Sequence, residues 1–164
     1  MKKILLTIFV ALLSIIILAT PIMATPATKT PVTATSVRTG TASGESWVTN
    51  GGIMQFRGYQ VVYAVTLNIE GESSLEGTSS NVWNGRLNMK TGEMIIHYNV
   101  VWTFPGGSFE GIIQSRLESY PQPYEYYEIH GVLQGTGVFE GQKLNLSYEG
   151  STIDPVWEGF LIRP

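Results

Sequence analysis

Apolar and polar residues alternate along the chain from about residue 44 onward. The alternation is clearest over residues 59–69 and 94–104, where almost every second side chain is large and apolar. Successive side chains of a β-strand point to opposite faces, so this pattern is typical of strands with one buried and one solvated face. No window in this part of the chain shows a helical period. The pattern therefore predicts an all-β domain of half-buried antiparallel strands.

One face of each expected strand collects the large apolar side chains, and we assign this face to the interior. The opposite face carries polar residues such as Asn84, His97, Asn99, Glu110 and Lys143. The residues assigned to the interior are Tyr59, Val61, Tyr63, Val65, Leu67, Ile69, Trp83, Leu87, Met89, Met94, Ile96, Tyr98, Val100, Trp102, Phe104, Phe109, Ile113, Leu117, Tyr127, Ile129, Leu133, Leu144, Leu146 and Tyr148.

Short turn signals separate the expected strands: NGG at 50–52, EGESS at 70–74, KTGE at 90–93, FPGG at 104–107 and YPQP at 120–123. Seven or eight strands joined by hairpins leave two unpaired edges unless the sheet closes on itself. We therefore predict a closed antiparallel up-and-down β-barrel of about eight strands. A two-sheet sandwich is the alternative, and the length of the strands favours the barrel.

An aromatic residue, a charged residue and a glycine recur together as FRG at 56–58, FEG at 109–111, FEG at 139–141 and WEG at 157–159. Phe139 and Leu144 are both expected inside, although their odd spacing would place them on opposite faces of a regular strand. A positive φ at Gly141 can absorb the extra residue as a bulge or tight turn. We therefore predict that Gly111 and Gly141 adopt positive φ and that the repeated phrase is structural.

The first 24 residues have the pattern of a secretory signal peptide. Lys2 and Lys3 precede an apolar run over residues 4–19, and the small residues around PIMATPA offer cleavage after Ala24 or Ala27. An uncleaved N-terminal anchor is the alternative, because the run is long for a signal peptide. Either alternative predicts an extracytoplasmic protein, secreted or held at the cell surface.

Residues 25–43 are rich in threonine and proline and contain few large apolar side chains. Such a segment buries too little surface to offset its conformational entropy. We therefore predict a disordered linker, either a plain spacer or an O-glycosylated stalk. The predicted organisation is a signal region at 1–24, a linker at 25–43 and a β-barrel domain at 44–164.

Composition restricts the class of partner. The chain contains no cysteine, so an exported domain of this sequence depends on packing and hydrogen bonds rather than disulfides. Loss of Lys2 and Lys3 with the signal region reduces the 10 basic residues to 8 against 13 acidic ones, a formal net charge of −5. This charge argues against nucleic acid and anionic membrane surfaces as partners. Membrane contact is expected only through an uncleaved N-terminal segment.

The stretch GTGVFEG, Gly135 to Gly141, resembles the G-T-G-x-F motif of allene oxide cyclases and dirigent proteins, which share an eight-stranded antiparallel β-barrel. The resemblance implies a barrel able to enclose an apolar pocket. Gln142 and Lys143 follow the motif here, where the family continues with a small residue and a glycine. The family's substrate-handling residues do not match positions of this chain, so the resemblance implies no catalytic residue.

Five aromatic residues on expected inner faces are the candidate ligand-binding residues. Together they would suit a flat apolar molecule in the barrel interior. The alternative is that they only fill a small barrel, whose interior is just wide enough for side chains. These residues are Tyr63, Trp83, Tyr98, Trp102 and Phe109.

The two histidines, His97 and His130, are the other candidates for chemistry. His130 shares a strand face with Glu128 and Tyr126, and an acid beside a histidine can bind a metal or form an acid–base pair. Both histidines are expected on the polar outer face, which favours an exposed cross-strand ladder over a metal site. The sequence has no zinc spacing, phosphate loop or Ser-His-Asp order, so no cofactor is expected.

Two classes of function follow from these observations. The first is an exported, non-enzymatic barrel that binds a small apolar ligand or acts at the cell surface. The second is an isomerase or cyclase of the allene-oxide-cyclase type acting on a lipid-derived substrate. A filled interior favours the first class, and a contiguous cavity with a buried acid or tyrosine favours the second.

Overall fold

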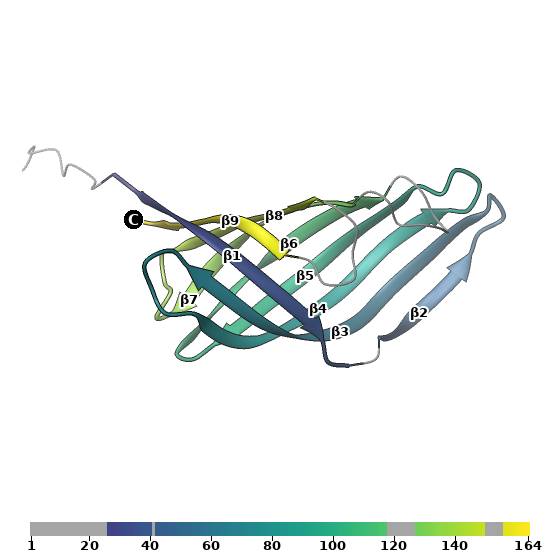
Figure 1. Ribbon diagram of the computed structural model, residues 1–164. Helices are drawn as coiled ribbons and strands as arrows, with labels where there is room; N and C mark the ends of the chain where they lie inside the picture. The colour runs from purple at the N-terminus through teal and green to yellow at the C-terminus, as the bar shows by residue number, and fades with distance from the viewer. Residues whose placement is uncertain (1–25, 41, 118–126, 150–155) are drawn as a thin grey trace, which may run out of the picture.

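The structure is a computed structural model that describes residues 26–40, 42–117, 127–149 and 156–164. The expected signal region at 1–24 and the expected turn at 120–123 lie outside these residues. Every regular element within them is a β-strand (Figure 1). The strands are β1 Thr28–Arg38, β2 Ser43–Val48, β3 Ile53–Ile69, β4 Leu75–Asn88, β5 Met94–Phe104, β6 Gly107–Leu117, β7 Tyr127–Gly137, β8 Lys143–Glu149 and β9 Val156–Arg163.

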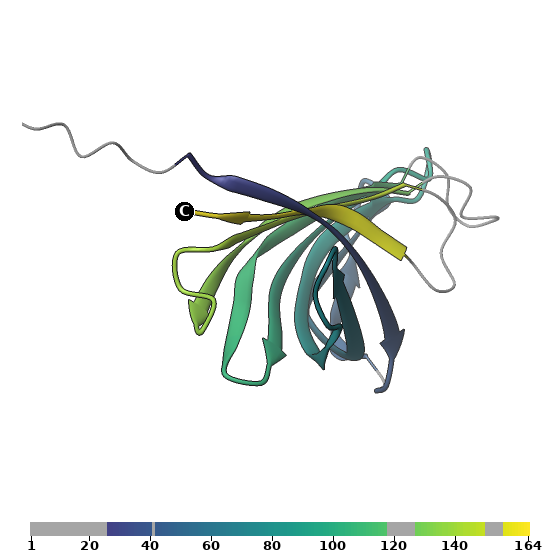
Figure 2. The ribbon, with the colours of Figure 1, turned by 60° about the vertical axis from the view of Figure 1, so that its left-hand side comes forward.

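Eight of these strands form a closed antiparallel barrel. Each strand from β3 to β8 pairs with the next strand along the chain. β1 completes the ring, because it pairs with β9 on one side and with β3 on the other. Figure 2 shows β1 crossing the open side of the curved sheet. The predicted all-β barrel of about eight strands is confirmed, and the two-sheet sandwich is excluded.

β2 replaces β1 beside β3 at one end of the barrel, which we call the open end because no described residue of β1 borders β3 there. The C-terminal part of β3, from Tyr63 to Ile69, pairs with β1, whereas its N-terminal part pairs with β2. β2 therefore extends the sheet beyond the ring, away from the C-terminus in Figure 1. All six residues of β2 are exposed. The inner side chains of β3 and β4 in this part, Phe56, Tyr59 and Trp83, are only half-buried.

The prediction of a disordered linker over residues 25–43 is wrong for Thr28–Arg38, which form β1. Val32, Ala34 and Ser36 point into the barrel and are buried, and the threonines between them are exposed. Threonine favours strands, and the small inner side chains fit a position where the sheet closes on itself. The segment folds because two neighbouring strands supply its hydrogen bonds and cover it, so it needs little hydrophobicity of its own.

Pro31 is compatible with this strand because of its position. Its carbonyl accepts a hydrogen bond from the backbone N–H of Glu70 at 3.0 Å. The carbonyl and the nitrogen of a strand residue point to the same side, so the nitrogen of Pro31 also faces Glu70. That side is where β3 has already ended at Ile69. The missing N–H of Pro31 therefore removes no ladder hydrogen bond between β1 and β3.

The predicted division between inner and outer faces is confirmed for the described side chains, with one exception. Met89 follows the end of β4 in a turn and is 57 % exposed, so its assignment to the interior is wrong. The side chains of Leu117 and Tyr127 lie outside the described part. The predicted residues that the structure buries are Val61, Val65, Leu67, Ile69, Leu87, Ile96, Tyr98, Val100, Trp102, Phe104, Phe109, Ile113, Ile129, Leu133, Leu144, Leu146 and Tyr148.

Two of the repeated aromatic-charge-glycine phrases bend the chain as predicted. Gly141 has a φ of 79° in the turn between β7 and β8, and Phe139 before it is buried. Gly58 has a φ of 65° at a register shift in β3, between Phe56 and Tyr59. The shift is a β-bulge that returns Tyr59 to the inner face after the extra residue.

The other two phrases do not bend the chain, and the predicted positive φ of Gly111 is wrong. Gly111 lies in a regular part of β6, where an added Cβ would come within 2.5 Å of the carbonyl oxygen of Val132. Gly159 is equally confined on β9, where an added Cβ would meet the carbonyl of Asn145. These two glycines permit close approach of neighbouring strands rather than an unusual backbone conformation.

Candidate functional site

Aromatic side chains fill one end of the barrel interior. Phe109 stacks on Phe139 with ring centroids 4.7 Å apart, and Phe104 meets both rings edge-on at 6.4 and 6.2 Å. Trp102 lies beside this cluster, packs edge-on against Trp157 at 6.2 Å and is only 2 % exposed. Two predicted ligand-binding residues, Trp102 and Phe109, are thus placed in a solid core.

The other three predicted ligand-binding residues lie toward the open end. Trp83 on β4 and Tyr98 on β5 are directly opposite each other, and their rings meet edge-on with centroids 5.3 Å apart. The hydroxyl of Tyr98 is buried and lies 2.9 Å from the Oγ of Ser115. Tyr63 pairs with Arg38, the last residue of β1, and so sits at the rim of the ring. Trp83 and Tyr63 are only half-buried.

The indole nitrogen of Trp83 is a buried donor without an acceptor. Its Nε1 atom is shielded from solvent and has no hydrogen-bond partner within the described part of the chain. Leaving such a donor unpaired costs about 1–3 kcal/mol. By contrast, Nε1 of Trp157 donates to the Oγ of Ser36 at 3.3 Å. The unpaired donor is therefore a feature of the interior near Trp83 and not of the interior near Trp157.

Tyr63 keeps its proton through neutral and mildly alkaline pH. Burial raises the pKa of the Tyr63 phenol above its usual 10.0, and the positive charge of Arg38 opposes this rise only in part. The phenol can therefore donate a hydrogen bond but is a poor general base near neutral pH.

The interior contains small polar residues that the sequence pattern missed. Ser79 is 1 % exposed and donates from its Oγ to the Oδ1 of Asn81 at 2.7 Å, and Ser115 is fully buried. Ser79 and Asn81 lie four and two residues before Trp83, so the period of two already placed them on its inner face. A search for apolar alternation passes over them because they are hydrophilic.

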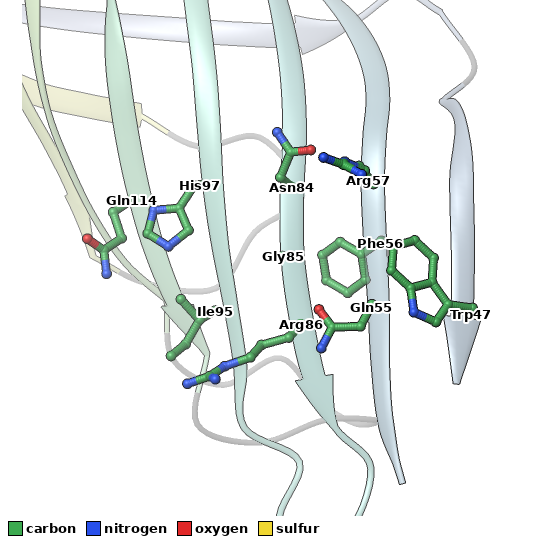
Figure 3. Close-up of a pocket in the computed structure, with 10 residues that line it drawn as sticks. All are labelled: Trp47, Gln55, Phe56, Arg57, Asn84, Gly85, Arg86, Ile95, His97 and Gln114. Carbon is green, nitrogen blue, oxygen red and sulfur yellow. The ribbon is translucent and has the colours of Figure 1, made fainter. Parts of the chain in front are cut away.

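A separate hollow lies on the outer face of the sheet. It has a volume of about 730 Å³ and is formed over β2 to β6, at the end of the barrel where β2 extends the sheet past the ring (Figure 3). The sequence pattern gave no sign of it, because outward polar residues on strands are usually just solvated. Its polar and aromatic lining includes Trp47, Arg57, Asn84, Arg86, His97 and Gln114.

The two histidines lie on the outer face, as predicted. His97 and His130 are both exposed and flank Gln114, which pairs with His97 on one side and His130 on the other. They are therefore two strand spacings apart, about 10 Å at the usual 4.8 Å per strand, which is too far for one metal ion. No group of three or more His, Asp or Glu side chains placed to hold a metal occurs among the described residues.

Comparison with models of known protein families, with curated proteins and with solved structures found no match. No helix long and apolar enough to cross a membrane occurs among residues that the structure describes.

Proposed function

We propose that this chain is an exported, non-enzymatic barrel that binds a small apolar ligand at its open end. The observation that carries the proposal is the buried, unpaired Nε1 of Trp83 beside half-buried aromatic rings. A ligand with one hydrogen-bond acceptor, such as a carbonyl or ether oxygen, would satisfy that donor. Its apolar body would cover the exposed parts of Trp83 and Tyr63.

The position of these residues supports entry from the open end. β1 pairs with β3 only as far as Tyr63, so the inner side chains of β3 beyond this point have no β1 beside them. Phe56, Tyr59 and Trp83 lie in this stretch of the sheet and are only half-buried. The opposite end is closed by the stacked phenylalanines, so a ligand would not pass through the barrel.

The groups around this end favour binding over catalysis. None of the acidic side chains that the structure describes is buried, so none supplies a carboxylate to the interior. The buried phenols include Tyr98, and Tyr63 holds its proton because its pKa is raised. A cyclase of the allene-oxide-cyclase type is the second candidate through the buried Tyr98 and the half-buried Tyr63, whose hydroxyls could polarise a carbonyl or epoxide oxygen as donors.

The export part of the proposal rests on Lys2, Lys3 and the apolar run that follows them. A mature chain beginning near Thr25 would leave β1 intact, since this strand starts at Thr28. N-terminal sequencing of the exported protein tests this directly. A soluble cytoplasmic protein that retains Met1 would contradict it.

The binding proposal is tested with two ligands that differ only in the acceptor, naphthalene and 2-acetylnaphthalene. We expect the acetyl compound to bind roughly tenfold more tightly, because satisfying a buried donor is worth about 1–3 kcal/mol and 1.4 kcal/mol corresponds to a factor of ten. The Trp83 indole N–H resonance should shift on binding, and the preference should vanish in Trp83→Phe, which keeps an aromatic ring but removes the donor.

Trp47→Phe provides the matched control, because Trp47 lies on the exposed strand β2 outside the barrel. This variant should keep the preference for the acetyl compound. Absence of binding by either ligand would refute the proposal, as would a preference that persists in Trp83→Phe. Recovery of a chemically altered lipid epoxide after incubation with the protein would instead support the cyclase.

A further inference from the structure

We propose that the outer hollow over β2 to β6 is a binding site for a short acidic oligosaccharide. This inference does not depend on the interior site, because the polar side chains of the hollow point outward whereas Trp83 and Tyr63 point inward; Phe56 borders both. Gln55, Arg86 and Ile95 form one cross-strand row of the hollow. Asn84, His97 and Gln114 form the next row. Hydrogen-bonding groups from several strands thus converge on one surface, about 4.8 Å apart from strand to strand.

The lining of the hollow contains positive charge and no acid. Arg57 and Arg86 supply the charge, and no Asp or Glu belongs to the lining. Neither arginine makes an ion pair or side-chain hydrogen bond with any residue that the structure describes. Arg116 and Arg163 differ in this respect, since they pair with Glu93 at 3.2 Å and with Glu72 at 2.7 Å. A guanidinium left unpaired in a hollow is suited to bidentate binding of a carboxylate.

The acidic residues nearest to the hollow lie outside its lining and indicate where an anion would be repelled. Glu45 is opposite Arg57 across β2 and β3 but is not part of the lining. A smaller hollow of about 310 Å³ shares Gln55, Arg86 and Ile95 and contains Glu93. An anionic group is therefore expected near Arg57 and the Asn84 amide, away from Glu93.

Asn84 is held in an orientation that adds donors. Its Oδ1 accepts a hydrogen bond from the backbone N–H of Gly58 at 3.0 Å, at the β-bulge of β3. The amide NH₂ group therefore points away from that bond and is available to a ligand oxygen. With two arginines beside it, the hollow is rich in donors, which matches a ligand rich in hydroxyl and carboxylate oxygens.

The exposed ring of Trp47 favours a sugar over a simple anion as the ligand of the hollow. Its side chain is 47 % exposed on β2 and borders the hollow in Figure 3. An indole ring exposed beside several hydrogen-bonding groups offers a ligand a flat apolar surface. A pyranose presents an apolar C–H face that can cover the indole ring while its hydroxyl and carboxylate groups face Asn84 and the arginines. A free phosphate or sulfate ion would leave Trp47 uncovered.

The charge of the whole protein favours a short saccharide over nucleic acid. A nucleobase could also stack on Trp47, but a nucleic acid strand carries a phosphate at every step. The phosphates beyond the hollow would face a chain with a formal net charge of −3 at pH 7. A uronic acid oligosaccharide of a few residues confines its charge to the cationic hollow.

The experiment measures binding of trigalacturonate to the mature protein by calorimetry at low salt. The matched ligand is its trimethyl ester, which has the same sugar rings without charge. We expect the acid to bind at least tenfold more tightly than the ester, and added salt to weaken the acid alone. Arg57→Gln and Arg86→Gln should each weaken the acid at least tenfold, and Trp47→Ala should weaken both ligands.

Arg163→Gln is the control variant, because it also removes one positive charge but lies on β9 outside the hollow. It should bind trigalacturonate as the unchanged protein does, and so should Trp83→Phe, which separates this site from the interior. Equal binding of acid and ester, no binding of either, or an equal loss in Arg163→Gln would overturn the proposal. Tighter binding of a single-stranded trinucleotide than of trigalacturonate would overturn it as well. Circular dichroism of each variant checks that the barrel is intact.

Discussion

Replacement of Trp102 by alanine is the most direct test of a filled barrel. Trp102 projects from β5 into the interior, where its ring meets Phe104 at 6.5 Å and Trp157 at 6.2 Å, both edge-on. Only 2 % of the residue is exposed. Trp157 belongs to β9, so the substitution removes packing between strands on different sides of the ring.

The expected loss can be worked out from this burial. A tryptophan side chain buries about 150–250 Å², which at about 25 cal/mol per Å² corresponds to about 4–6 kcal/mol. Alanine keeps part of that area, while the cavity left by the indole adds to the loss, so we expect about 3–5 kcal/mol. A domain of this kind has about 5–15 kcal/mol of stability in total. Trp102→Ala therefore removes a large share of it.

The assay is urea denaturation followed by far-ultraviolet circular dichroism. Trp102→Phe, expected to lose about 1–3 kcal/mol, gives a usable value if Trp102→Ala does not fold. Trp47→Ala is the control, because the same residue type at 47 % exposure should change stability by about 0.5 kcal/mol or less. If Trp102→Ala and Trp47→Ala cost the same, the interior around Trp102 is not packed and the reasoning fails.

Three further predictions concern a glycine, a hydrogen bond and a titration. Gly141→Ala should lower the free energy of unfolding by about 1 kcal/mol or more because Gly141 has a positive φ, and Gly141→Asn should lower it less, because asparagine tolerates positive φ. Gly111→Asn should be no more stable than Gly111→Ala. Equal losses for Gly141→Ala and Gly141→Asn in denaturation would contradict this. A double-mutant cycle of Ser115→Ala and Tyr98→Phe should give a coupling free energy of about 1 kcal/mol. A coupling of zero would show that the hydrogen bond between the two hydroxyls does not stabilise the fold. Because burial raises the pKa of Tyr63 in the folded state, stability is retained below pH 10.0 and falls above it as the unfolded chain ionises first; the fall should be shallower in Tyr63→Phe.

The sequence pattern predicted the fold where one face of a strand is strongly apolar. The alternation over β3 and β5 identified the inner faces, because a slip of one residue would expose every large side chain. It failed at β1, whose buried residues Val32, Ala34 and Ser36 are small. Their burial depends on β3 and β9, which lie far away in the sequence and cannot be read from the segment itself.

The candidate sites were predictable only in part, for a similar reason. The sequence placed Tyr63, Trp83 and Tyr98 inside, but it did not indicate that the Nε1 of Trp83 lacks a partner, which depends on three-dimensional geometry. The outer hollow was missed altogether. Its arginines, Arg57 and Arg86, are ordinary outward residues until pairing brings β2, β3 and β4 together.

The seam that β1 makes with β9 has a consequence for the order of folding. It joins strands at residues 28–38 and 156–163, the most distant pair along the described chain, and contacts between such distant segments are the slowest to form. Until β9 is in place, β1 and β8 each present an unpaired edge to other chains. A chain that crosses a membrane unfolded, N-terminus first, would stay in this open and association-prone state until its final strand emerged. The contact between Trp102 and Trp157 forms only once β9 has docked, so tryptophan fluorescence of the nascent chain would time the closure.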